Sequence, residues 1–326
     1  MPDNSRCIRI WQSSLRTAGL VTAAALVTLC LAGPVRAGDR GMVGALLLSL
    51  RYPFLVTLNN AMETEAAKQG VDLVSLDPQQ SATRERHQVE DLIHRKVEVI
   101  VMIPVDQEIS QIAAKLINAA GIPLILLNTK FADDFASNGG QFLTYIGSDD
   151  TEAGKIQGQF LADKLPQGGN VIYLVGEYGG ASTERRKAGF ESVIESHPNL
   201  RIVAELQAHG VRADAKAVME NLLQKFGKGQ LQALVAQSDE MAIGASSAVQ
   251  AADRLGEFKV LIGVDGSKAA LDAVRVGTLT ATVFQDAVGQ GRQAMDAAVR
   301  ILAGGTIEPQ LMIPFKLVTK DNVSSF

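Results

Sequence analysis

Polar and aromatic side chains stand where the short apolar runs of this chain end. These side chains belong to Arg51, Tyr52, Phe54, Asn128, Thr129, Gln237, Ser238, Asp265 and Gln285. A carboxylate accepts hydrogen bonds from neighbouring hydroxyls, an amide both donates and accepts, and an aromatic ring covers a face of C–H groups. Together they would form a pocket suited to a polyhydroxylated ligand. The alternative is that such residues cap the next helix, and capping is the favoured interpretation for Asp106, Ser148 and Asp239.

Catalytic and metal-binding patterns are weak by comparison. No histidine has a metal-ligand spacing, and we expect solvated surface residues at His87, His94, His197 and His209. No Gly-x-Ser-x-Gly, His-Glu-x-x-His or phosphate-loop pattern occurs, and Gly289-Gln290-Gly291-Arg292 does not follow the first strand as a dinucleotide fingerprint would. Glu177 and Glu184 lie in or near a glycine-rich segment, but no catalytic partner can be named for them. The sequence therefore predicts no catalytic residue, no cofactor and no metal.

The elements that must position these side chains alternate regularly from residue 41 onward. Short apolar runs predict strands at 42–48, 71–76, 97–103, 124–127, 143–146, 171–175, 202–206, 233–236, 260–264 and 281–284. Amphipathic stretches between them predict helices at 56–69, 83–95, 108–120, 152–164, 183–195, 213–226, 240–252, 267–276 and 288–302. The alternation predicts an α/β fold with parallel sheets, which bind ligands at the carboxyl ends of their strands.

The number of predicted strands indicates two sheets. Ten strands exceed what one small doubly wound sheet usually holds, so we expect the chain to divide near residues 138–143, in a Ser-Asn-Gly-Gly loop. Two similar doubly wound lobes result, with the ligand in a cleft between them. Because no charged or proline-rich linker separates them, several short crossovers are expected. The acidic Ser148-Asp149-Asp150 segment just beyond is expected to cap a helix and to favour its dipole.

Residues 1–37 differ from the rest of the chain. Arginines at 6, 9 and 16 precede an uncharged apolar run from Ala18 to Ala32, and Val35-Arg36-Ala37 offers small residues for cleavage before Gly38. This pattern predicts a removable signal peptide, with a retained membrane anchor as the alternative. The remaining chain has 27 basic and 34 acidic residues and neither cysteine nor tryptophan. It has no large basic field, so nucleic acid is not an expected partner.

The order and spacing of several motifs resemble the periplasmic sugar-binding proteins of ABC transporters, in the ribose-binding branch. The motifs are Tyr52-Pro53-Phe54, Glu65-Ala66 with Gly70, Ile103-Pro104-Val105-Asp106, Ala120-Gly121-Ile122-Pro123, Ile146-Gly147-Ser148-Asp149, Arg186-Lys187-Ala188-Gly189-Phe190, the segment 236–244 and Gly263-Val264-Asp265-Gly266. The resemblance covers nearly the whole chain after the leader. It implies two lobes joined by a three-strand hinge: an N-terminal lobe at 40–143 plus 286–314, and a C-terminal lobe at 144–285 plus 315–326.

The resemblance also implies ligand residues. Phe54 matches the ring that lies against the sugar, Asp265 the carboxylate that accepts hydroxyls, and Gln285 the amide beside the hinge. Elsewhere the chain departs from the ribose pattern, and no aromatic residue stands near His209-Gly210. The other candidate ligand residues are Tyr52 in place of Asn, Asn128 and Thr129 in place of Asp-Arg, Glu184 in place of Arg with Arg185 beside it, Ser238 in place of Asn, and Arg51. These changes disfavour D-ribose and favour another sugar or a polyol.

The function implied is that of an exported, non-catalytic binding protein. It would capture a neutral sugar or polyol in the periplasm as a monomer and deliver it to an ABC transporter permease in the membrane. One alternative is a sensory protein of the same fold that presents its ligand to a receptor or a histidine kinase. A second, less favoured alternative is an exported enzyme that modifies a sugar, with Glu184 or Asp265 as general acid or base.

Overall fold

The computed structural model describes residues 41–131 and 134–326, and the expected signal peptide at residues 1–37 lies outside them. A first six-stranded sheet has the order β2-β1-β3-β4-β5-β11, and all its strand pairs are parallel. Its strands are β1 (Met42–Leu47), β2 (Asp72–Leu76), β3 (Val99–Ile103), β4 (Leu124–Asn128), β5 (Thr144–Gly147) and β11 (Gln310–Met312). The helices that accompany it are α1 (Pro53–Gln69), α2 (Ala82–His94), α3 (Ile109–Ala119), the short α4 (Asp134–Ser137) and α10 (Ala287–Leu302). These elements form the first lobe.

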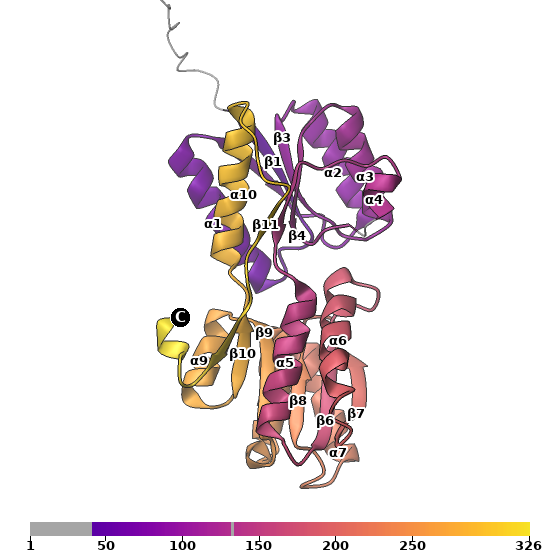
Figure 1. Cartoon of the computed structure of the whole chain (residues 1–326), viewed down its shortest axis with the longest axis vertical. Coiled ribbons are helices and arrows are strands. Elements are labelled where there is room, and N and C mark those ends of the chain that lie inside the picture. Colours follow the sequence, from indigo (N-terminus) through magenta and orange to yellow (C-terminus); the bar gives the residue numbers. More distant parts are fainter. Residues whose placement is uncertain (1–40, 132–133) are drawn as a thin grey trace, which may run out of the picture. The chain divides into compact units, whose positions relative to one another are not determined.

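A second six-stranded sheet repeats this order as β7-β6-β8-β9-β10-β12, with β12 antiparallel to β10. Its strands are β6 (Gly169–Val175), β7 (Leu200–Gln207), β8 (Ala233–Ala236), β9 (Val260–Asp265), β10 (Ala281–Phe284) and β12 (Lys316–Thr319). The helices that accompany it are α5 (Asp150–Lys164), α6 (Ala181–Ile194), α7 (Arg212–Lys225), α8 (Asp239–Ala251) and α9 (Lys268–Val276), with 3₁₀ turns at Leu255–Glu257 and Val323–Ser325. These elements form the second lobe (Figure 1).

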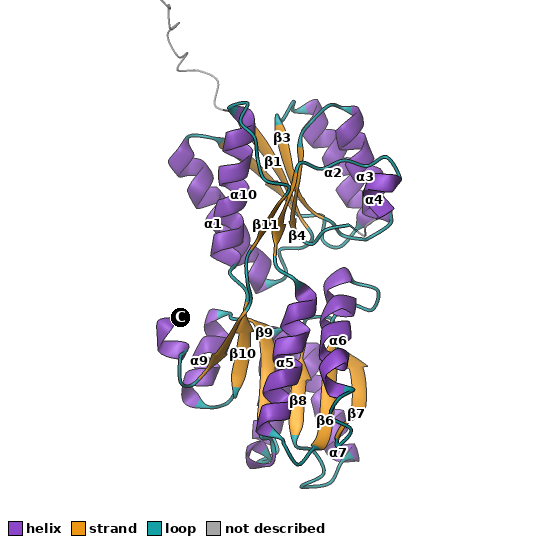
Figure 2. Cartoon of the chain, in the orientation of Figure 1, coloured by secondary structure: helices purple, strands orange, loops and turns teal. Residues whose placement is uncertain are grey.

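Each sheet is covered by helices on both faces (Figure 2). In the first lobe α1 and α10 bury one face and α2 and α3 the other; in the second lobe α5 and α6 cover one face and α7, α8 and α9 the other. The central strands are therefore apolar throughout, as in β3, where all five residues of Val-Ile-Val-Met-Ile are buried. This accounts for the continuous apolar runs in the sequence and confirms the predicted α/β fold with two doubly wound lobes.

All ten predicted strands are present, but the predicted set lacked β11 and β12. Both are short edge strands with partly exposed residues, so their sequences show no continuous apolar run. The predicted division after residue 143 also differs from the observed pairing. β5 pairs with β4 and β11 in the first sheet, so the first lobe extends through Gly147. A short run such as β5 carries no sequence signal that assigns it to one sheet or the other.

Three short segments connect the lobes. They follow β5, β10 and β11, at residues 148–149, 285–286 and 313–315. Each carries the chain directly from an element of one lobe into an element of the other.

A buried carboxyl holds the loop after β3. Glu85, on α2, is fully buried, and its Oε1 accepts a hydrogen bond from the backbone N–H of Val105 at 3.0 Å. Its other oxygen accepts from the hydroxyl of Ser110, which in turn accepts from the N–H of Asp106 at 3.0 Å. Burial raises the pKa of the Glu85 carboxyl to about 7. Glu85 therefore fixes the Pro104–Asp106 segment, which reaches the cleft described below.

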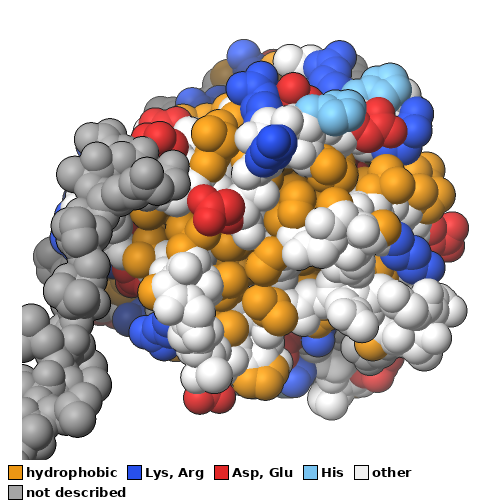
Figure 3. Space-filling view, turned by 90° about the horizontal axis from the view of Figure 1, so that it is seen from above, with side chains coloured by type: hydrophobic (Ala, Val, Ile, Leu, Met, Phe, Trp, Pro, Cys, Tyr) orange, Lys and Arg blue, Asp and Glu red, His pale blue; other side chains and the backbone are white. Residues whose placement is uncertain are grey.

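The histidines of α2 are exposed, as predicted for His87 and His94. Figure 3 shows histidine side chains at the surface of the first lobe, beside charged and apolar ones. Among residues 41–131 and 134–326, no helix is both long and apolar enough to cross a bilayer.

The close packing of α5 against α6 requires glycine at two facing positions. A Cβ atom at Gly189 would lie 1.9 Å from the carbonyl oxygen of Thr151, and one at Gly154 would lie 1.9 Å from that of Arg186. We therefore expect Gly189→Ala to lower the free energy of unfolding by about 2 kcal/mol or more, because the helices must separate. Gly256→Ala, with nothing within 4 Å of its Cβ, is the matched control. Equal midpoints for both variants in chemical denaturation would contradict this packing.

Glu85→Gln should change how stability depends on pH. Because the folded-state pKa of Glu85 is about 7, above the ordinary 4.5, the folded protein holds more protons than the unfolded chain between these values. The contribution of this group is fully present below pH 4.5 and declines as pH rises to about 7, by on the order of 3 kcal/mol at most. The variant lacks this decline. The free energy of unfolding of the variant minus that of wild type should therefore be greater at pH 8 than at pH 5.

Urea denaturation at the two pH values measures this difference. Glu90→Gln, on the same helix and with 41% of its side chain exposed, is the control and should run parallel to wild type. If Glu85→Gln also ran parallel to wild type, the carboxyl would not be held as described.

Candidate ligand-binding site

A cleft of about 560 Å³ lies between the two lobes. It is lined by segments that follow β1, β2, β3 and β4 of the first sheet and β6, β7, β8, β9 and β10 of the second, at the carboxyl ends of parallel strands. Parallel α/β sheets present their polar loop residues at this end, because the strand interiors are buried. The position of the predicted site at the carboxyl ends of the strands thus agrees with the observed cleft.

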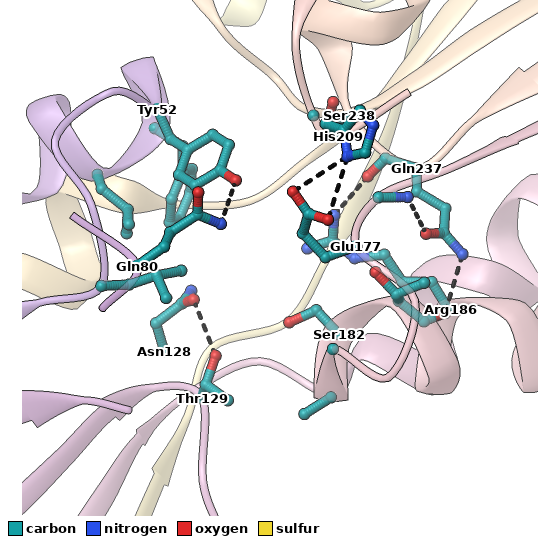
Figure 4. Close-up of a pocket in the computed structure, with 18 of the residues that line it drawn as sticks. Tyr52, Gln80, Asn128, Thr129, Glu177, Ser182, Arg186, His209, Gln237 and Ser238 are labelled. Atoms are coloured by element: carbon teal, nitrogen blue, oxygen red, sulfur yellow. Dashed lines mark hydrogen bonds and ion pairs between the residues drawn. The ribbon is translucent and has the colours of Figure 1, made fainter. Parts of the chain in front are cut away.

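The first lobe contributes an aromatic and amide wall. Tyr52, Phe54, Gln80, Asn128 and Thr129 line this side of the cleft. The Nε2 of Gln80 donates to the Tyr52 hydroxyl at 2.8 Å, and burial raises the pKa of that hydroxyl above its ordinary value. Figure 4 shows Tyr52, Gln80, Asn128 and Thr129 on one side of the pocket, facing the residues of the second lobe.

Asn128 adopts a left-handed backbone conformation at the end of β4, with φ of 60°. Its side-chain Nδ2 donates to Gln290 of α10 at 3.1 Å, and its backbone carbonyl oxygen accepts from the Tyr145 hydroxyl at 2.8 Å. Asparagine tolerates this backbone region better than most residues. These contacts aim the end of β4 into the cleft.

The second lobe contributes a carboxylate and an amide. Asp265 ends β9, and Gln285 follows β10 directly and is buried. Burial raises the pKa of the Asp265 carboxyl well above its ordinary value, and the nearby carboxyl of Asp239 raises it further, while the Arg186 guanidinium opposes both effects. Hydroxyl donors that replace lost water would stabilise the charged form. Asp265 is therefore suited to accept hydrogen bonds from a bound ligand.

Arg186 is a buried cation at the floor of the cleft. Its Nε donates to Asp150 at 2.8 Å, its Nη1 to the carbonyl oxygen of Gln237 at 2.5 Å, and its Nη2 to the side-chain oxygen of Gln285 at 3.4 Å. Its charge is paired with Asp150, whose side chain is only 4% exposed. Arg186 thus joins α6 to the start of α5, to the loop after β8 and to the segment after β10.

The Gln237 side chain fixes the glycine-rich loop that follows β6. Its oxygen accepts from the N–H of Gly176 at 3.0 Å, and its Nε2 donates to the Tyr173 hydroxyl and the carbonyl oxygen of Thr183, both at 2.9 Å. The side chain is buried and makes hydrogen bonds through both ends of its amide. Because both ends of this amide hold the loop, contacts with a ligand would come from neighbouring residues.

One set of contacts crosses the mouth of the cleft. A guanidinium nitrogen of Arg51, in the first lobe, donates to the carbonyl oxygen of His209 at 3.0 Å and lies 3.7 Å from the Glu177 carboxylate of the second lobe. Glu177 also contacts His209 Nδ1 at 3.2 Å, as Figure 4 shows. The Tyr52 ring packs against Gly210, where a Cβ atom would lie 2.9 Å from the ring. These contacts join the lobes over the site.

The structure brings together seven of the ten candidate ligand residues. The seven that line the cleft are Tyr52, Phe54, Asn128, Thr129, Ser238, Asp265 and Gln285. Arg51 lies at the mouth and contacts protein atoms. Glu184 and Arg185 do not line the cleft, and the Oε1 of Glu184 accepts from the N–H of Gly179 at 3.1 Å. Because successive helical residues point about 100° apart, it is Arg186 that faces inward from this helix.

Several helix-cap interpretations also change. Asp106 precedes the N-cap residue of α3, which is Glu108, and its Oδ1 accepts from the N–H groups of Glu108 and Ile109 at 2.8 and 2.7 Å, so it satisfies the start of the helix much as expected. Ser148 and Asp239 are not caps: α5 is capped by Asp149 and α8 by Ser238. Asp150 lies in the first turn of α5, as expected of a dipole partner, and it also forms the buried ion pair with Arg186.

Several polar residues that line the cleft were not among the predicted ligand residues. They include Gln80, Glu177, Arg186 and His209. His209 is exposed, as expected of a surface residue, and it also lines the cleft and contacts Glu177. The Arg-x-x-Gly-Phe pattern was a signal for Arg186, because Gly189 permits the close approach of α5 and Phe190 stacks on Tyr173 at 4.6 Å between ring centroids. No group of three or more acidic, histidine or cysteine side chains that could hold a metal occurs in the described part of the chain.

Known proteins share this architecture and sequence. Residues 44–306 match the family described as periplasmic binding protein domain. The ribose import binding protein RbsB of Bacillus subtilis (strain 168) is 33% identical over 92% of this chain and 95% of its own length. A putative rhizopine-binding protein of Rhizobium meliloti is 31% identical over 87% of this chain and 92% of its own length.

Solved structures agree with this assignment. An ABC transporter solute binding protein from Bacillus halodurans C-125 with bound myo-inositol is 34% identical, with a TM-score of 0.82, and the match covers 88% of this chain and 98% of that one. A Caulobacter myo-inositol binding protein bound to myo-inositol is 26% identical, also with a TM-score of 0.82, over 90% and 98% of the two chains. The fold, the position of the cleft and the sequence match together show that this chain belongs to the periplasmic binding protein family.

Proposed function

We propose that this protein binds a neutral sugar or polyol in the cleft and delivers it to an ABC transporter permease. The observation that carries the proposal is the convergence of a ring, a carboxylate and two amides, namely Phe54, Asp265, Asn128 and Gln285, on one cleft. Such a set recognises hydroxyls and C–H faces together. The relatives named above are binding proteins and importer components, which agrees with a binding function rather than an enzymatic one.

The charges of the cleft favour a neutral ligand over an anionic one such as a sugar phosphate. Of the described residues that line the cleft, Arg186 is the only arginine and no lysine is among them. Arg186 is already paired with Asp150 and donates to two further oxygens. An anion would therefore meet Asp265 and Glu177 without a free cation to balance it, which would oppose binding.

The wider assignment follows from the expected signal peptide and from the family. We propose that the protein acts as a monomer in the periplasm, where ligand contacts from both lobes favour the closed arrangement of the cleft. Closure presents a surface composed of both lobes, and a permease would recognise that surface. The departures from the ribose pattern, together with the inositol-bound relatives, make cyclic polyols the first ligands to test.

A thermal-shift screen of residues 38–326 against pentoses, hexoses, tetritols, hexitols and inositols tests this function. An external dye is needed because these residues include no tryptophan. A ligand at about 100 times its dissociation constant adds about 2.7 kcal/mol of stability, which raises the midpoint by several degrees. A shift confined to one class of compounds is expected, and a folded protein that responds to none would contradict the proposal.

Asp265→Ala should abolish binding of the compound that shifts wild type most, while the protein remains folded. The carboxylate accepts ligand hydroxyls, and its loss leaves them unpaired in a buried site, at a cost of about 1–3 kcal/mol per group. Calorimetry measures the effect, with far-UV circular dichroism as the test of folding. His87→Ala, an exposed change on α2, should bind as wild type does. Wild-type affinity in Asp265→Ala would show that the ligand lies elsewhere.

Arg51→Met should weaken binding of every ligand by the same factor. Arg51 contacts Glu177 and His209 across the mouth, and its guanidinium lies 4.9 Å from the centre of the Tyr52 ring, but it does not itself line the cleft. We therefore expect its loss to act on closure rather than on ligand identity. An exposed ion pair contributes up to about 1 kcal/mol, so we expect up to about a fivefold loss of affinity. Calorimetry with two different ligands measures both factors, and Arg95→Met, which loses only a pair within α2, is the control. Unequal factors for the two ligands would indicate direct contact with Arg51.

A further inference from the structure

Asp239 is a buried carboxyl that neither caps its helix nor lines the cleft. It is the first residue of α8 and is 0% exposed, and the cap is supplied by Ser238. Its Oδ1 accepts from the Thr282 hydroxyl of β10 at 2.6 Å, and its Oδ2 accepts from the backbone N–H of Ser267 at 2.7 Å. Both partners belong to other elements, so the side chain connects α8 to β10 and to the turn after β9.

That turn has an unusual backbone. Asp265 has φ of 128° and Gly266 has φ of 70°. Glycine adopts such values freely, but an aspartate there costs about 1–3 kcal/mol, and this conformation persists only where surrounding contacts impose it. The turn therefore needs partners for the amides that follow Asp265.

Asp239 supplies those partners, directly and through one hydroxyl. Thr282 Oγ1 accepts from the N–H of Gly266 at 3.3 Å while it donates to Asp239. The N–H of Ser267 donates to Asp239 itself. The two amides that follow Asp265 are thus both held by one buried side chain and its threonine partner.

Close packing leaves Asp239 little room to move. A Cβ atom at Gly263 would lie 2.5 Å from Asp239 Oδ1 and 2.9 Å from its Cα, so the glycine lets α8 approach β9 at this point. The aspartate is therefore seated directly on the strand that ends in Asp265.

The two carboxyls also influence each other's charge. Burial is the main cause that raises the pKa of each, and the charge of Asp239 raises the pKa of Asp265 further. The backbone N–H of Asp239 and the Arg186 guanidinium act in the opposite direction on Asp265, and Glu240 adds a small increase. Asp239, Arg186 and Glu240 are thus the charged groups with the largest effects on Asp265.

We propose that Asp239 is the positioning residue for Asp265: through its contacts with Ser267 and Thr282 it imposes the turn that places the Asp265 carboxyl at the cleft. The assignment of Asp265 as a ligand contact rests on the proposed function. The connection between Asp239 and the turn does not, because every contact in it lies within the second lobe.

Two substitutions separate the contacts of Asp239 from its charge. In Asp239→Asn, the amide oxygen can still accept from Ser267 and the amide nitrogen can donate to Thr282 Oγ1, so the turn is kept and the charge is removed. In Asp239→Ala, both contacts are lost. Asp272→Asn removes a charge from exposed α9, where Asp272 pairs with Lys268 and Arg275, and serves as the matched control.

The first measurement uses no ligand. Carbon-13 NMR of labelled aspartate carboxyls follows the titration of Asp265 in full-length mature protein, residues 38–326, and amide shifts report the Gly266-Ser267 turn. In Asp239→Asn we expect Asp265 to titrate at lower pH than in wild type with the turn unchanged, and in Asp239→Ala the two amides should shift. Asp272→Asn should match wild type. Amide shifts of Gly266 and Ser267 that are the same in wild type and Asp239→Ala would overturn the proposal.

The second measurement is calorimetric binding of myo-inositol and D-ribose between pH 5 and pH 8. Asp239→Ala should lose at least about tenfold in affinity, because buried amides lose their partners and the carboxylate turns away. Asp239→Asn should bind as wild type does at pH 8 and keep its affinity to lower pH, since the lower pKa keeps Asp265 charged. Equal affinities for the alanine and asparagine variants would overturn the positioning role. If neither compound binds wild type while the NMR result is as expected, the positioning role stands and the choice of ligand fails.

Discussion

The buried guanidinium of Arg186 is the interaction on which the cleft depends. It donates to Asp150, which directly follows the first connection between the lobes, and to the side chain of Gln285, which lies in the second. It also donates to the backbone carbonyl oxygen of Gln237, in the loop after β8. A buried charge is tolerated only when it is paired and its donors are used, and removal of one partner leaves the other uncompensated. The pair therefore fixes where α5, α6 and the segment after β10 meet, and Arg186 and Gln285 line the cleft at this point.

The two lobes solve the same physical problem in the same way. A parallel sheet covered on both faces has an apolar interior, so polar chemistry is possible only in the loops at its ends. Those loops must be held firmly, and each lobe holds one of them with a buried carboxyl: Glu85 binds the N–H of Val105 after β3, and Asp239 binds that of Ser267 after β9. Each carboxyl also engages a hydroxyl, Ser110 or Thr282. Both carboxyls have raised pKa values because burial disfavours their charged forms.

Strain and closure are concentrated where a ligand would lie. Asn128 and Asp265, from opposite lobes, both have positive φ, and each is held by contacts from neighbouring elements. At the mouth, Arg51 reaches Glu177 and the backbone of the second lobe through exposed groups of modest strength. The ion pair of Arg186 is thus buried, whereas the pair at the mouth is exposed and of modest strength.

The sequence by itself determined the alternation of strands and helices, the two lobes and the site at the strand ends, because buried parallel strands must be apolar and the residues that follow them are free to be polar. Only the tertiary structure decided that β5 and β11 belong to the first sheet, since such short strands have no signal for a particular neighbour. It also decided that Arg186 faces inward in place of Glu184 and Arg185, and that Asp239 supports the site from behind. The rotation of a helix about its axis and the contacts between segments far apart in the sequence determine these features. A local pattern of residue types gives no information about either.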